Sequence, residues 1–222
     1  MNFMKLPAEL RLKIYGNLLL AHSGVHVIRP YVSGLYPDIL RTCKKVYQEA
    51  REVIYSKNLF LFVDADDFVI IFLQAIGIQN ASLIKHVHIS FPIFDQTGDD
   101  YIFDRNEAVV CDVIAQRCPR IEHVTIIPTH PLFFQYTPDD DVNASTDRFL
   151  ELVNKRFREF TDRISISLFE DACHDIRGKL SSLGWDVIVE RKKEYYPRQS
   201  APQGDRELTD TDNNFGDSGF GV

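Results

Sequence analysis

The chain has 222 residues, a formal net charge of −7 and 45% hydrophobic residues, a composition sufficient for one ordinary domain with a buried core. Charged residues interrupt the first twenty positions, and the longest apolar run, Phe68–Leu73, is far shorter than a membrane span. We therefore expect neither a secretory signal nor a transmembrane helix. We expect an intracellular protein, cytoplasmic or nuclear, with reduced cysteines.

Charge is distributed unevenly along the chain. Residues 1–57 carry a net charge of +5, residues 58–192 carry −9 and residues 193–222 carry −3. We expect three parts with these boundaries: a helical module, a helix–strand body and a disordered tail that is rich in Pro, Gln, Ser, Gly and Asp. The basic first part favours an acidic partner, whereas the overall pI of about 5.5 argues against nucleic acid.

The first predicted helix follows Pro7, which suits a first helical turn because its φ is preset. Apolar residues recur every four positions, and Tyr15 and Leu19 widen the resulting stripe. We expect Glu9, Arg11 and Lys13 on the solvent face. A helix this short needs a docking surface, in this chain or another. The stripe consists of Leu6, Leu10, Ile14 and Leu18.

Two further elements are predicted before residue 57. Val25–Ile28 has the alternation of a short strand, which could form a hairpin with Tyr31 and Val32. A second helix is expected from Ile39 to Tyr55, with Asp38 as its N-cap.

These two helical stretches resemble the F-box-like proteins that are numerous in filamentous fungi. The similar segments are LPAELRLKIYGNLL and ILRTCKKVYQEAREVIYSKNLF, about a quarter of the chain. The second segment carries the more specific part of the pattern. The matching positions are Leu6, Pro7, Glu9, Leu10, Arg11, Ile14, Tyr15, Leu40, Arg41, Thr42, Cys43, Val46, Tyr47, Glu49, Ala50, Tyr55, Asn58 and Phe60.

The resemblance implies a substrate-recruiting subunit of a cullin-type ubiquitin ligase. In that role a Skp1-type adaptor contacts the first part and the body recruits a protein target. A standard F-box joins its helices through a few residues, whereas Ala21 to Asp38 lies between them here. The alternative is a stand-alone interaction domain without a ligase role. The residues expected to contact the adaptor are Leu6, Pro7, Leu10, Ile14, Leu18 and Leu40.

The body is predicted to alternate strands and helices, which makes the fold class α/β. Ile84–Ile89 and Ile121–Ile126 are similar segments 37 residues apart, each at the end of a helical stretch. We expect these strands to be parallel neighbours, in a leucine-rich-repeat-like array or an open parallel sheet. The remaining predicted strands are 59–63, 164–168 and 185–190, and the predicted helices are 66–76, 107–116, 147–160 and 170–183.

Two polar segments, Asp95–Asp104 and Thr129–Asn143, are predicted loops. The second contains Phe133, Phe134 and Tyr136, which we expect either to form an exposed partner-binding patch or to anchor the loop.

No chemical motif predicts catalysis. His86, His88 and His123 could place imidazoles on neighbouring strands, but the sequence supplies no clear fourth ligand or supporting shell for zinc. The chain lacks a G-x-S-x-G elbow and a phosphate-binding glycine loop. We therefore predict a protein-interaction role, with no enzyme activity, cofactor, metal, nucleic acid or membrane partner.

Overall fold

The computed structural model describes residues 3–29, 33–63, 66–91, 94–97, 100–128, 140–159, 161–169 and 176–190. The chain divides into two units, Met1–Arg191 and Lys192–Val222. The second unit, which contains the whole predicted tail 193–222, lies outside the described residues. No helix in the described ranges has the length and apolar character needed to cross a membrane.

The N-terminal region contains two packed α-helices. A 3-10 turn, η1 (Phe3–Lys5), precedes α1 (Ala8–Leu19), with Pro7 at its N-cap position. Another 3-10 turn, η3 (Pro37–Arg41), precedes α2 (Lys44–Lys57). The single helix predicted from Ile39 is therefore wrong, because Cys43 is extended (φ −162°, ψ 163°) and separates the two helical pieces.

The main sheet has six strands, and helices alternate with them along the chain. The strands are β1 (Val25–His26), β2 (Leu59–Phe62), β3 (His86–Ser90), β6 (His123–Ile127), β7 (Ile164–Phe169) and β8 (Asp186–Glu190). The helices beside them are α3 (Asp66–Ile76), α4 (Ile78–Ala81), α5 (Arg105–Arg117), α6 (Asp140–Arg158) and α7 (Ile176–Ser182).

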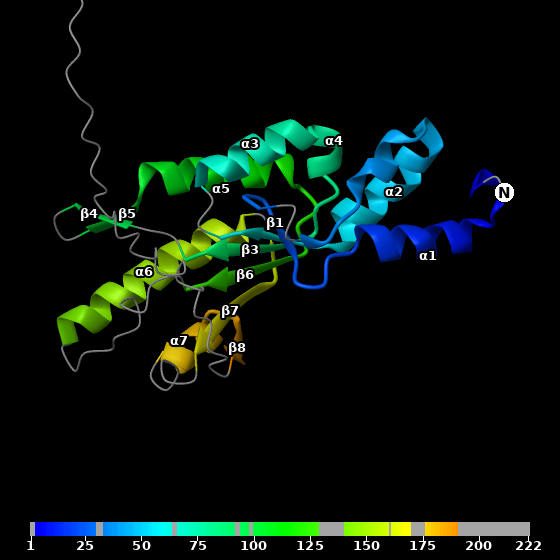
Figure 1. The fold of residues 1–222 in the computed structure, drawn as a ribbon. Helices are drawn as coiled ribbons and strands as arrows, with labels where there is room; N and C mark the ends of the chain where they lie inside the picture. The colour runs from blue at the N-terminus through cyan, green and yellow to red at the C-terminus, as the bar shows by residue number, and fades with distance from the viewer. Residues whose placement is uncertain are drawn as a thin grey trace, which may run out of the picture. The chain divides into compact units, whose positions relative to one another are not determined.

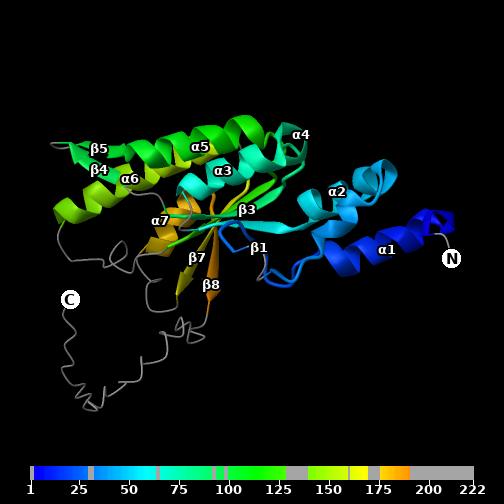
Figure 2. The ribbon, with the colours of Figure 1, turned by 45° about the horizontal axis from the view of Figure 1, so that its top comes forward.

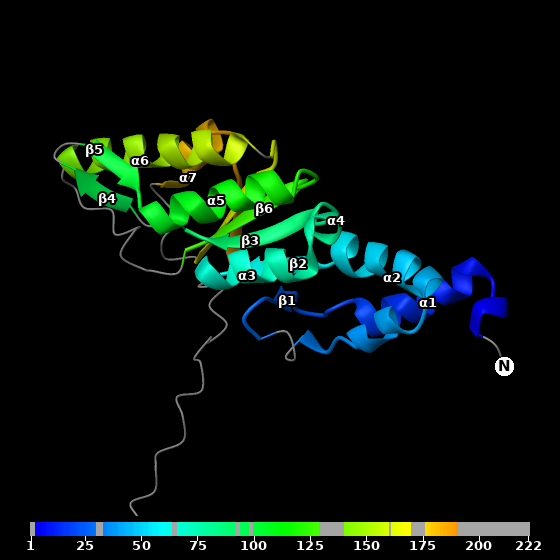
Figure 3. The ribbon, with the colours of Figure 1, turned by 90° about the horizontal axis from the view of Figure 1, so that it is seen from above.

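Strand order follows chain order, β1-β2-β3-β6-β7-β8, and every pairing is parallel. The α/β class and the open parallel sheet are thus confirmed. His86 pairs with His123 and Ile89 with Ile126, so the two similar segments lie in register as neighbours. Helices α3, α5 and α6, which connect successive strands, lie side by side on the same face of the sheet (Figures 1 and 3).

One large apolar cluster lies between that face and the helices. Alternate strand residues point into it, including Phe60, Val87, Val124 and Ile164 at one level across four strands. The helices contribute fully buried side chains from the other side: Val69, Leu73, Ile114, Val153, Phe157 and Leu180.

Three segments differ from their sequence-based predictions. The expected loop 95–104 contains an antiparallel pair, β4 (Phe94–Thr97) and β5 (Asp100–Phe103). Helix α6 begins at Asp140 and thus includes the end of the second predicted loop. Val25–His26 pairs in parallel with β2, and the proposed hairpin partner Tyr31–Val32 lies outside the described residues.

Candidate functional site

Helix α1 is attached to α2 by a polar network inside their interface. The Arg11 guanidinium donates from Nε to Glu49 Oε2 (2.9 Å) and from Nη2 to Glu49 Oε1 (2.7 Å). The Tyr15 hydroxyl donates to Glu49 Oε2 at 3.1 Å. Arg11 is only 6% exposed, so its prediction as a solvent-face residue is wrong. Its two-point bond to Glu49 allows the charge to leave water.

This network shifts the pKa values of its members. Hydrogen bonds from Arg11 and Tyr15, and the nearby positive charge, hold the pKa of Glu49 below its usual range. Burial, followed by the hydrogen bond to the Glu49 carboxylate, raises the pKa of Tyr15 to about 12. The pair therefore remains ionised, and the tyrosine protonated, over the whole neutral range.

Asn58 connects the helix pair to the first long strand. Its Nδ2 donates to Leu19 O (2.6 Å) and Ile54 O (2.8 Å), at the ends of α1 and α2. Its Oδ1 accepts the Ala21 amide at 2.8 Å. Asn58 is buried and directly precedes β2. One side chain thus satisfies backbone groups at two helix ends, which sequence reasoning did not predict.

The apolar stripe predicted for α1 lies beside the buried face of the helix. Tyr15 and Leu19 are fully buried against α2, together with Val46 and Ala50. Leu10 is 45% exposed. With 100° per residue, Leu10 and Ile14 lie on one side of the buried face, and Leu12, also 45% exposed, lies on the other. The helix therefore carries two separately exposed apolar positions.

The other residues predicted to contact a partner have different environments. Leu6 and Ile14 are half-buried and Pro7 is exposed. Leu18 and Leu40 are half-buried and pack against the small apolar cluster between α1 and α2. We define the outer flank of α1 as Leu6, Leu10 and Ile14. Phe133, Phe134 and Tyr136 lie outside the described residues.

The second face of the main sheet carries polar residues on most of its strands. One row of aligned residues crosses all six strands: His26, Leu61, His88, Thr125, Ser165 and Asp186. His123 pairs with His86, two residues before this row on strands β6 and β3. Its Nε2 is 2.6 Å from Ser165 Oγ. Burial and the charges of His86 and Arg163 lower the pKa of His123, against the opposing effect of Asp186.

Among the described residues, this arrangement gives no ligand cluster for a zinc ion at His86, His88 and His123. Within the described ranges, no three His, Cys, Asp or Glu residues are placed to hold a metal ion. His86 and His123 are cross-strand neighbours, but His123 directs Nε2 to a serine hydroxyl. Cys111 and Cys118 are buried, and burial raises the pKa of each thiol to about 12.

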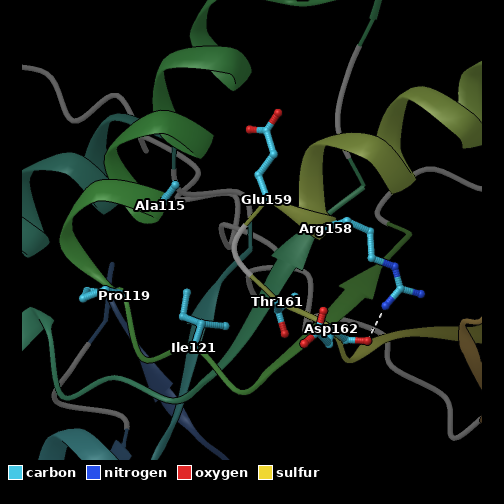
Figure 4. Close-up of a pocket in the computed structure, with 7 residues that line it drawn as sticks. All are labelled: Ala115, Pro119, Ile121, Arg158, Glu159, Thr161 and Asp162. Carbon is cyan, nitrogen blue, oxygen red and sulfur yellow. Dashed lines mark hydrogen bonds between the residues drawn. The ribbon is translucent and has the colours of Figure 1, made fainter.

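A hollow of about 410 Å³ lies where the ends of α5 and α6 meet the starts of β6 and β7. Two of its charged side chains, Arg158 and Glu159, bond to other groups of the chain (Figure 4). Arg158 donates to the carbonyl oxygens of Asp162, Leu183 and Gly184, and the Glu159 carboxylate accepts from Arg156. Figure 4 shows Glu159 pointing away from Thr161 and Asp162. Arg158 thus serves to join the loop after α6 to the turn before β8.

No family model, curated protein or solved structure matches this chain. The functional argument therefore rests on the chain's own geometry and on the resemblance stated in the sequence analysis.

Proposed function

We propose that this chain is a protein-interaction subunit that binds a Skp1-type adaptor through the outer flank of α1 and recruits a protein target to a cullin-type ubiquitin ligase. The observation that carries the proposal is the 45% exposure of Leu10, between the half-buried Leu6 and Ile14. Each of these side chains gains free energy when another polypeptide covers it. The contribution is scaffolding: the chain positions two partners and makes or breaks no bond.

The division of roles within the F-box-like motif supports this proposal. Its polar residues Arg11, Glu49 and Asn58 bond to groups within the chain, and its residues Val46 and Ala50 fill the helix interface. Those positions are explained by folding alone. Leu10, in contrast, belongs to neither buried apolar cluster. An exposed leucine flanked by two partly exposed apolar residues is a surface that suits a partner helix.

The position of the helix pair is also suitable for binding. The small cluster between α1 and α2 is distinct from the large cluster under the sheet, with Leu35 and Tyr55 packed against both. Figures 1 and 2 show α1 and α2 beyond one end of the main sheet, so the sheet does not cover α1. A partner can approach the helix while the body remains available for a target.

Calorimetric titration of the full chain with a purified Skp1-type adaptor tests the proposal. We expect saturable binding with a dissociation constant near or below about 1 μM, typical of a small specific interface. Amide hydrogen exchange with and without the adaptor should show new protection within residues 8–19. Absence of binding at about 100 μM adaptor, or protection confined to the strands, would contradict the proposal.

A second function is favoured by one observation. Strand β1 lies between α1 and α2 in sequence and pairs with β2, so the N-terminal region takes part in the main sheet. That connection suits a stand-alone interaction domain in which the helix pair completes the fold. In this case a target binds with the same affinity whether or not the Leu10 side chain is present. The adaptor titration separates the two functions because only the first function requires a saturable complex between this chain and the adaptor.

A further inference from the structure

Helix α3 has an exposed apolar side. Val69 and Leu73 are fully buried beneath it, yet Phe68 is 53% and Ile71 is 58% exposed. Ala75 is exposed one turn further along. The spacing of three and then four residues places Phe68, Ile71 and Ala75 in one row, as in the contact row of a coiled coil. We call this row the α3 stripe.

The α3 stripe lies at the end of the helical layer. Phe72, which neighbours the stripe on the helix surface, packs against Phe60 (5.7 Å between ring centroids) and Phe62 (6.3 Å) of β2. This contact places Phe68 and Ala75 on the β2 side of α3, and Ile71 lies opposite the buried Val69, whereas α5 packs on the other side of the helix. Figure 3 shows α3 as the first helix of the layer, followed by α5 and α6. In the part of the chain that the structure describes, no further helix follows on the stripe side.

An apolar end is unusual for an array of stacked units. Each unit in such an array covers the apolar flank of the one before it, and terminal units normally present a polar outer surface instead. The exposed described side chains of α3 include a single charged residue, Asp67, beside Gln74 on the other side of the outward surface. Depletion of charge around exposed aromatic and aliphatic residues is typical of an interface core.

We propose that the α3 stripe is the interface of a homodimer, in which the α3 helices of two copies pack antiparallel about a two-fold axis. The occupant is a second copy because the stripe is complementary to itself. With the axis near Ile71 and Phe72, Phe68 of one copy lies opposite Ala75 of the other, so each large side chain meets a small one. A two-fold interface requires this self-matching. The inference is independent of the proposed adaptor binding, which uses another helix.

Charge also permits the pairing. Each chain carries a net charge of −7, so two copies associate only through a face that has little of that charge. In the antiparallel pair the two Asp67 positions are nine residues apart along the axis, about 13 Å at 1.5 Å per residue. That separation exceeds the Debye length of about 8 Å at physiological ionic strength. The stripe therefore brings the copies together without an opposing pair of carboxylates.

The expected dimer is weak and concentration-dependent, because two exposed large side chains per copy are fewer than a standard interface buries. Sedimentation equilibrium of the full chain between about 1 and 200 μM should show the mass rising from 25.6 kDa toward twice that value. Ile71→Glu should weaken association at least about tenfold. Leu12→Glu is the matched control, since Leu12 is an exposed leucine on α1, and it should associate like the wild-type chain.

A crosslinking experiment locates the interface. In a chain with Cys43→Ser and Cys173→Ser, Ile71→Cys places a thiol near the two-fold axis, and oxidation should give a disulfide-linked dimer. Gln74→Cys, on the polar side of α3, should not crosslink under the same conditions. A monomeric mass for the wild-type chain at every concentration would overturn the inference. So would association that Ile71→Glu leaves unchanged, or crosslinking of both variants to the same extent.

Discussion

In the body, the helices and one face of a six-stranded sheet close around an apolar cluster in which Phe157, Ile126 and Leu180 are fully buried. In the pair α1–α2, a small apolar cluster lies beside an arginine–glutamate pair and a tyrosine hydroxyl. Body stability therefore depends on the area removed from water, and the helix pair depends in addition on charge and hydrogen-bond geometry. The two regions should respond differently to core truncation and to pH.

The difference also explains where a partner can bind. The helices that cover one face of the body's sheet bury most of its apolar side chains and leave the α3 stripe exposed, whereas a two-helix contact covers only one side of each helix. Arg11, Tyr15 and Leu19 occupy the covered side of α1, and Leu10 remains outside it. Helix α1 therefore packs into the fold through one side and exposes Leu10 on another side.

Truncating the body core should have the largest effect. Phe157→Ala removes a ring with no exposure from the cluster under the sheet and should lower the free energy of unfolding by about 3–5 kcal/mol. Chemical denaturation followed by the fluorescence of Trp185 measures the change. Val109→Ala, at a position of α5 that is 46% exposed, should change the value by less than about 0.5 kcal/mol. Equal losses for both variants would contradict the assignment of the core.

Removing the Asn58 side chain should destabilise the helix pair more than the sheet. Asn58→Ala leaves the carbonyl oxygens of Leu19 and Ile54 without their side-chain donor in a buried site, at a cost of about 2–3 kcal/mol. We expect faster amide exchange at the end of α1, with β6 and β7 little affected. Asn17→Ala is a matched control at an exposed position of the same helix. Uniform acceleration across the sheet would show that the regions unfold as one.

Acid should weaken the helix pair before the body. The folded pKa of Glu49 lies below its ordinary value of 4.5, so its stabilising contribution is complete above that pH and is lost as the pH falls through the folded pKa. As the pH falls below about 4.5, the protection factors of the α1 amides, which correct for slower intrinsic exchange in acid, should therefore decrease before Trp185 fluorescence changes. Glu49→Gln should reduce the pH dependence of the α1 protection factors. The exposed pair Lys85–Glu122 contributes little to the body.

Sequence patterns predicted the body well because apolar periodicity is strong there. Ile84–Ile89 and Ile121–Ile126 alternate residues on a buried face, and their 37-residue offset correctly predicted neighbouring parallel strands. Helix α3 has the bounds predicted for it, 66–76, and Gly77 follows it with a φ of +76°. The hairpin β4–β5 was missed, since acidic and polar residues in that segment resemble a loop when only hydrophobicity is considered.

Long-range polar contacts could not be predicted in the same way. Arg11 belongs to the solvent face by local pattern alone, and its burial depends on Glu49, which lies 38 residues later. Asn58 is similar, because its partner carbonyl at Leu19 is 39 residues away. Both residues matched positions of the F-box-like pattern, which was the available sign of a specific role. The pattern could not separate a structural role from partner binding.

The most direct test compares adaptor affinity for two variants of the same helix. Leu10→Asp and Leu12→Asp alter leucines of equal exposure, 45% each, on opposite sides of the buried face, and each should change the free energy of unfolding by less than about 0.5 kcal/mol. Titration of a Skp1-type adaptor should show at least about tenfold weaker binding for Leu10→Asp and wild-type binding for Leu12→Asp. Equal affinities for the two variants would contradict binding through the outer flank of α1.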